Sequence, residues 1–109
     1  MKLHGAALAF ILLATPAGAG FFDGNKLHEL CGDYPDFAET YTMGVIDAAS
    51  IYQPLMGVKD RICLPKGVRS DQIRDVACKY LVDNPAIRHW PAADVVLESA
   101  AAAWPCKRS

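Results

Sequence analysis

The apolar positions of this chain recur with a helical period, most clearly between residues 37 and 55. Pro35 suits the first turn of a helix there, and Pro54 and Gly57 are expected to end it. We predict that the apolar stripe of this helix faces the core; it consists of Phe37, Tyr41, Gly44, Val45, Ala48, Tyr52 and Leu55. Met43 and Ile46 lie away from this stripe, so we expect them to form a second, outward apolar patch.

Three further helical segments complete the pattern. A short helix over residues 26–31 follows a turn at residues 23–25, where Asp23 or Asn25 can cap it. Ser70 and Asp71 open a third helix as cap and first-turn acid, and Asn84-Pro85 closes it. Pro91 starts a fourth helix, which Pro105 stops. The inward residues are predicted to be Ile73, Val76, Ala77, Tyr80 and Leu81 in the third helix, and Ala93, Val96, Leu97, Ala100, Ala101 and Trp104 in the fourth.

No segment of useful length shows the alternation of a strand, and there is no internal repeat or linker. The expected fold is therefore all-α: a small four-helix domain of three main helices plus the short N-terminal one.

Residues 1–19 have the features of a secretory signal peptide. Lys2 and His4 make a weakly basic start, residues 6–14 are apolar, and Ala17-Gly18-Ala19 is a small-x-small cleavage site. The apolar run is shorter than the roughly 17–25 residues that cross a bilayer. We therefore expect a cleaved leader, an exported domain over residues 20–109, a periplasmic location and no membrane attachment after cleavage.

Composition excludes several classes of partner. The 109 residues include 11 basic and 12 acidic ones, for a net charge of −1. A balanced charge offers no basic footprint for nucleic acid and no polybasic run for an anionic membrane. The roughly 90 residues after the leader suffice for one domain with a modest core.

The four cysteines all follow the leader, and no two of them form a C-x-x-C motif. That spacing disfavours a zinc site or a redox motif, and an exported chain favours two disulfides, for which three pairings exist. Helices joined by short connections tend to lie antiparallel, which brings the regions of Cys63 and Cys106 to one pole and those of Cys31 and Cys78 to the other. We predict these two bonds; the alternative for Cys78 is a buried free thiol.

Five landmarks in order resemble the Rap/Tai immunity proteins. They are Asn25-Lys26-Leu27 followed by Cys31, then Tyr41-Thr42-Met43-Gly44-Val45-Ile46-Asp47-Ala48, then Cys63-Leu64-Pro65-Lys66-Gly67-Val68, then Tyr80-Leu81 with Pro85, and finally Trp104-Pro105-Cys106. Cys78 lies outside that family pattern.

The resemblance implies a helical periplasmic protein that protects a Gram-negative bacterium from an amidase delivered by type VI secretion. Such a protein would bind the peptidoglycan amidase and block its cleft, without a cofactor and without catalysis of its own. It needs a rigid scaffold and a projecting segment with a few anchoring side chains.

Two segments carry candidate anchors. The first is the loop over residues 56–66, with Lys59, Asp60 and Arg61 as contacts; the alternative is an ordinary solvated turn. The second is Arg88-His89-Trp90, where the alternative for Trp90 is packing on the fourth helix ahead of Pro91.

Other functions remain open at this stage. Ser50, His28 and Asp47 supply the side-chain types of a hydrolytic triad, but no nucleophile elbow surrounds them, so we do not expect an enzyme. The alternatives to an immunity protein are an acid-stress type of periplasmic chaperone and a structural module that binds an unknown partner. The outward patch expected at Met43 and Ile46 could also serve a homodimer.

Overall fold

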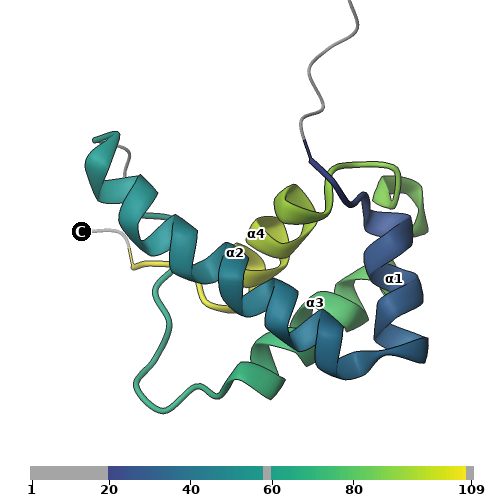
Figure 1. The fold of residues 1–109 in the computed structure, drawn as a ribbon. Coiled ribbons are helices and arrows are strands. Elements are labelled where there is room, and N and C mark those ends of the chain that lie inside the picture. The colour runs from purple at the N-terminus through teal and green to yellow at the C-terminus, as the bar shows by residue number, and fades with distance from the viewer. Residues whose placement is uncertain (1–19, 58–59, 108–109) are drawn as a thin grey trace, which may run out of the picture.

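The structure is a computed structural model that describes residues 20–57 and 60–107. The predicted leader, residues 1–19, and the predicted contact Lys59 lie outside the described residues. Within them the fold is all-α, as predicted (Figure 1). The elements are α1 (Gly24–Asp33), α2 (Pro35–Leu55), α3 (Ser70–Asp83), the short 3₁₀ helix η2 (Pro85–Ile87) and α4 (Ala92–Ala103).

Local signals place most of the helix ends where the sequence puts them. The Asp23 carboxylate accepts the N–H of Lys26 at 2.8 Å and caps α1. Tyr34 alone separates α1 from α2, which begins at Pro35. Gly57, with φ of 68°, adopts the left-handed conformation just after α2 ends.

The prediction that Ser70 caps α3 is wrong. Ser70 is the first residue of that helix, and its hydroxyl donates to the Glu39 carboxylate of α2 at 2.6 Å. Arg74 donates to the same carboxylate at 3.0 Å, so Glu39 joins α2 to the first turns of α3.

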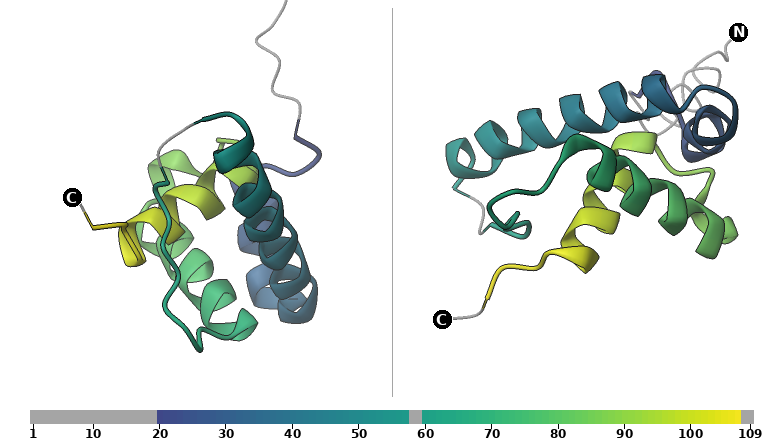
Figure 2. Two further views of the ribbon diagram at one scale, coloured as in Figure 1. Left: turned by 90° about the vertical axis from the view of Figure 1, so that its left-hand side faces the viewer. Right: turned by 90° about the horizontal axis from the view of Figure 1, so that it is seen from below.

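The core lies where all four helices meet. α2 runs across α3 and α4, and its C-terminal half extends past them toward residues 60–69 (Figure 2). The third-helix prediction is confirmed at its centre, since Ile73, Ala77 and Leu81 are buried. In α4 the buried side is rotated slightly from the predicted one and consists of Ala92, Val95, Val96, Ser99 and Ala100.

The predicted inward face of α2 is wrong in part: Tyr41 and Val45 are half-buried and pack against the core, but the rest of the predicted stripe is exposed. The residues buried in α2 are Ala38, Thr42 and Ile46, whereas Phe37 is 67% and Tyr52 63% exposed. Small residues on the buried side let the other helices approach closely, and the overhanging C-terminal half of α2 leaves Tyr52 without a covering helix. The expected outward patch is wrong for the same reason, because Ile46 belongs to the core.

Both disulfides pair as predicted. Cys31–Cys78 joins α1 to α3, with the Cα atoms 5.9 Å apart. Cys63–Cys106 joins the loop before α3 to the segment after α4, with the Cα atoms 4.9 Å apart. The N–H of Cys63 also donates to the carbonyl of Trp104 at 2.9 Å. The loop is thus held to the C-terminal segment by one covalent bond and one backbone hydrogen bond.

Candidate functional site

The first predicted contact segment lies at the C-terminal end of α2. Asp60 and Arg61 are exposed. The backbone N–H of Arg61 donates to the side-chain oxygen of Gln53 in α2 at 3.1 Å, and its guanidinium pairs with Glu98 of α4 at 3.2 Å. Arg61 therefore spans the gap between α2 and α4 while half of its side chain faces solvent.

The second predicted segment is fastened to the body of the domain. Arg88 Nε donates to the carbonyl of Leu81 at 2.7 Å, near the C-terminal end of α3. The carbonyls there have no partner within the helix, so the Arg88 guanidinium satisfies a group that would otherwise need water. The carbonyl of Trp90 accepts the N–H of Gly24 at 2.8 Å, which ties the segment to α1. His89 and Trp90 remain exposed.

The close approach of this segment to α1 requires a glycine. A Cβ built on Gly24 would lie 2.7 Å from the carbonyl oxygen of Arg88, closer than such atoms approach in proteins. The two predicted segments lie at opposite ends of the domain (Figure 1). The structure therefore does not bring Arg61 and His89 into one surface patch.

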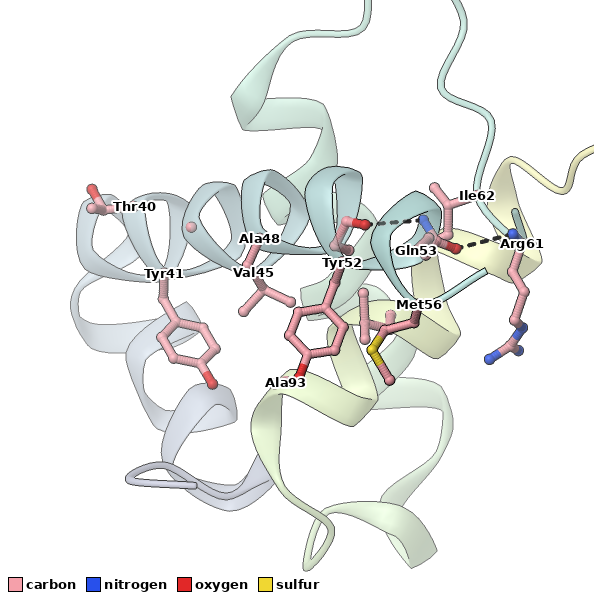
Figure 3. A pocket seen from close by; sticks show the side chains of 13 residues that line it. Thr40, Tyr41, Val45, Ala48, Tyr52, Gln53, Met56, Arg61, Ile62 and Ala93 are labelled. Carbon is pink, nitrogen blue, oxygen red and sulfur yellow. Dashed lines mark hydrogen bonds between the residues drawn. The ribbon is translucent and has the colours of Figure 1, made fainter. Parts of the chain in front are cut away.

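An apolar groove between α2 and α4 was missed by the sequence analysis. Its volume is about 740 Å³, and Arg61 lies at one end of it. Figure 3 shows Tyr41, Val45, Tyr52 and Met56 projecting from the same side of α2. Ala93 and Leu97 of α4 form the opposite wall. The sequence feature that could have indicated this groove is the apolar stripe of α2. Its helical period was recognised, but its residues were predicted to face the core.

A second hollow of about 460 Å³ continues the groove past Tyr41. It is lined by Leu30 of α1, by Phe37 and Tyr41 of α2, and by two aromatic residues outside these helices, Phe22 and Tyr34. The rings of Phe22 and Tyr41 lie 5.3 Å apart between centroids. We call the surface formed by Phe37, Tyr41, Val45, Ala48, Tyr52 and Met56 the outer face of α2. It runs the full length of the helix.

The groove carries little charge of its own. Burial, and to a lesser degree the negative charge of Asp94, raises the pKa of the Tyr41 phenol above its ordinary value, so this side chain is neutral at physiological pH. Glu98 balances the charge of Arg61 at the other end. A partner would therefore be held in the groove mainly by burial of apolar surface.

The part of the chain that the structure describes contains no cluster of side chains arranged to hold a metal ion. Nor does a helix in those residues combine the length and apolar character needed to cross a bilayer. The hydroxyl of Ser50, one of the triad types considered above, donates to the carbonyl of Asp47 in its own helix at 2.7 Å.

The family model of the Rap1a immunity proteins matches residues 23–106, which includes all four helices and both disulfides. The chain belongs to this family. The resemblance noted in the sequence is thereby confirmed. The chain has no match among curated proteins and none among solved structures.

Membership in the Rap1a immunity proteins gives the chain an immunity-type function against a secreted effector, exercised by binding that effector. Members of this family are typically not enzymes. The two disulfides fit an extracellular or periplasmic location, where the redox environment preserves them.

Proposed function

We propose that this Rap1a immunity protein acts in the periplasm, where it binds a peptidoglycan amidase delivered by type VI secretion and blocks its cleft. The observation that carries the proposal is the family match over residues 23–106. The proposed signal peptide would bring the chain to the compartment that contains peptidoglycan.

A rigid scaffold supports a mechanism of occlusion. Cys63–Cys106 and the hydrogen bond from Cys63 to Trp104 hold the loop before α3. A loop that is ordered before binding loses less conformational entropy when it docks, so more of the contact energy remains as affinity. Occlusion needs no catalytic group on the immunity protein.

We propose Lys59, Asp60 and Arg61 as the first contacts with the amidase. Arg61 combines exposure with a position fixed by Gln53 and Glu98, which suits an anchoring arginine. His89 and Trp90 form the second surface. The Arg88 guanidinium donates a hydrogen bond to the carbonyl of Leu81 in α3. We therefore propose that Arg88 holds the second surface in place.

The test is capture of partners from the periplasmic and secreted proteins of the host with the oxidised protein, followed by mass spectrometry. We expect one stoichiometric amidase whose hydrolysis of peptidoglycan falls when the immunity protein is added. A set of unrelated clients captured only at low pH would contradict the proposal and favour a chaperone. Recovery of the chain alone would also contradict it.

A matched pair of arginines tests the contact surface. Arg61 and Arg69 are both exposed and both paired with a carboxylate, of Glu98 and Asp71 respectively. Arg61→Asp is expected to weaken amidase binding by about 2 kcal/mol, or roughly 30-fold in Kd, because it removes an anchor. Arg69→Asp should leave the Kd unchanged. Titration calorimetry measures both values, and melting curves check that both variants fold; equal Kd values would place the contact elsewhere.

A further inference from the structure

We propose that the Cys63–Cys106 disulfide is a redox switch on effector binding: its reduction releases the contact loop, residues 60–69, while the helical core stays folded. This inference rests on the proposed function, because it concerns the affinity for the amidase. The two disulfides of the chain differ in burial and in the other contacts that join the segments they connect.

The Cys31–Cys78 bond belongs to the helical core. Both cysteines are half-buried and pack against the core residues. The two helices that they join, α1 and α3, also contribute the buried Leu27 and Leu81 to that core. The core therefore partly shields this bond, and the position of α1 does not depend on the bond alone.

The Cys63–Cys106 bond lies outside the core and outside the helices. Cys63 is exposed, and neither cysteine is among the residues that pack against the core. Exposed disulfides are more easily reduced than well-protected structural ones. We therefore expect a dithiol to reduce Cys63–Cys106 before Cys31–Cys78.

Few contacts besides the disulfide join the contact loop to the C-terminal segment. Residues 63–67 are all exposed. An isolated β-bridge pairs Ile62 with Pro105, and the N–H of Cys63 donates to the carbonyl of Trp104 at 2.9 Å. Even a complete two-stranded hairpin is only marginally stable in water by itself, and this pairing is shorter. Reduction therefore lets residues 63–67 separate from the C-terminal segment.

This separation would loosen Arg61, the proposed anchor. Arg61 would keep its backbone hydrogen bond to Gln53 and its ion pair with Glu98, but exposed ion pairs contribute little to stability. The residues after Arg61 would have to be ordered again when the amidase binds, and the conformational entropy lost in that step lowers the affinity. The reduced form should bind the amidase about tenfold more weakly, or weaker still.

The switch operates by thiol–disulfide exchange with a dithiol. One thiolate of the dithiol attacks the Sγ atom of Cys63, the bond between the two sulfur atoms breaks, and Cys106 leaves as a thiolate that takes up a proton. The second thiolate attacks the mixed disulfide and displaces Cys63, which is also protonated. The dithiol leaves as a disulfide, so two electrons pass from it to the protein.

The charges near the sulfur atoms favour the same bond. Lys107 directly follows Cys106 and is exposed. Positive charge near a sulfur atom stabilises its thiolate, and a more stable thiolate leaves faster. The lysine beside Cys78, Lys79, is instead paired with Asp83 at 2.8 Å. Cys106 is therefore the better leaving group.

Such a switch would link binding to the proposed export. Thiols are kept reduced in the cytosol, whereas the periplasm forms disulfides through a disulfide oxidant that accepts the two electrons. The chain would therefore acquire its ordered contact loop, and with it full affinity for the amidase, after it leaves the cytosol.

Partial reduction of the oxidised wild-type protein tests the order of reduction without an amidase. The protein is incubated with dithiothreitol, free thiols are alkylated at successive times, and the alkylated cysteines are identified by mass spectrometry. We expect Cys63 and Cys106 to be alkylated while Cys31 and Cys78 are still bonded. Far-UV circular dichroism should stay unchanged at that stage, and hydrogen exchange should rise in residues 61–67. Equal rates for all four cysteines, the reverse order, or loss of helix with the first bond would overturn the proposal.

Two double variants test the effect on binding to the amidase that the wild type captures. Cys63→Ser/Cys106→Ser should stay helical and raise the Kd about tenfold or more, because the loop is no longer held. Cys31→Ser/Cys78→Ser is the matched control; it should be less stable, but its folded fraction should bind with the wild-type Kd. An unchanged Kd for the first variant, or an equal loss of affinity in both, would overturn the switch. An oxidised wild type that binds no amidase would instead overturn the proposed function.

Discussion

The two faces of α2 differ in the size and exposure of their side chains, and the more exposed face carries several large apolar residues. The buried face carries Ala38, Thr42 and Ile46, whereas Phe37 and Tyr52 on the outer face are more than half exposed. The small residues Ala38 and Thr42 fit where α2 meets the other helices at close range, whereas the larger Tyr41 and Val45 pack only at the edge of the core. The exposed side chains of Phe37, Tyr52 and Met56 form the kind of apolar patch that marks an interaction site.

The largest contrast in stability is expected between two isoleucines of the same helix. Ile46 is 8% exposed and Ile51 is 67% exposed. Ile46→Ala should lower the free energy of unfolding by roughly 2–4 kcal/mol, because it leaves a cavity in the core. Ile51→Ala should change it by less than about 0.5 kcal/mol. Urea unfolding measures both changes; equal losses would place Ile46 outside the core.

A smaller contrast in the free energy of unfolding is expected between leucine substitutions at two alanines of α2. Ala38 is fully buried, whereas Ala48 is exposed on the outer face. Ala38→Leu should cost roughly 1–3 kcal/mol, because the added side chain must displace packed neighbours. Ala48→Leu should be close to neutral, because the added side chain faces solvent. The same unfolding experiment applies, and tolerance of leucine at position 38 would show that the contact there is not tight.

The features that depend on nearby residues were predictable from the sequence. Asp23, Pro35 and Gly57 mark helix boundaries by their own chemistry, and they do so in the structure. The disulfide pairing followed from helix order and short connections, which bring Cys63 to Cys106 and Cys31 to Cys78.

The orientation of α2 was not predictable, because apolar residues occupy both of its faces. Periodicity identifies a stripe but does not say which neighbours cover it. Ile46 and Tyr52 both count as apolar in the sequence pattern, and the positions of the other helices decide that Ile46 is buried and Tyr52 exposed. For the same reason the groove between α2 and α4 was missed.

The roles of the candidate contact residues depend on distant partners. Arg88 resembles a free surface arginine in the sequence, but its guanidinium reaches back to the carbonyl of Leu81. Arg61 reaches Gln53 and Glu98, which are 8 and 37 residues away. Such contacts form only in the completed fold. The sequence therefore identified Arg61 and Arg88 as candidates but not the groups that they contact.

The central claim about α2 is that its buried side stabilises the fold, whereas the exposed residues of its C-terminal half contribute little to stability. The most direct test compares the midpoints of urea unfolding of the wild type, Thr42→Glu and Tyr52→Glu, because Thr42 is fully buried and Tyr52 is 63% exposed. We predict a large fall of the midpoint for Thr42→Glu, since a buried charge without a partner is costly, and a midpoint close to that of the wild type for Tyr52→Glu. A midpoint for Tyr52→Glu as low as that of Thr42→Glu would contradict the account.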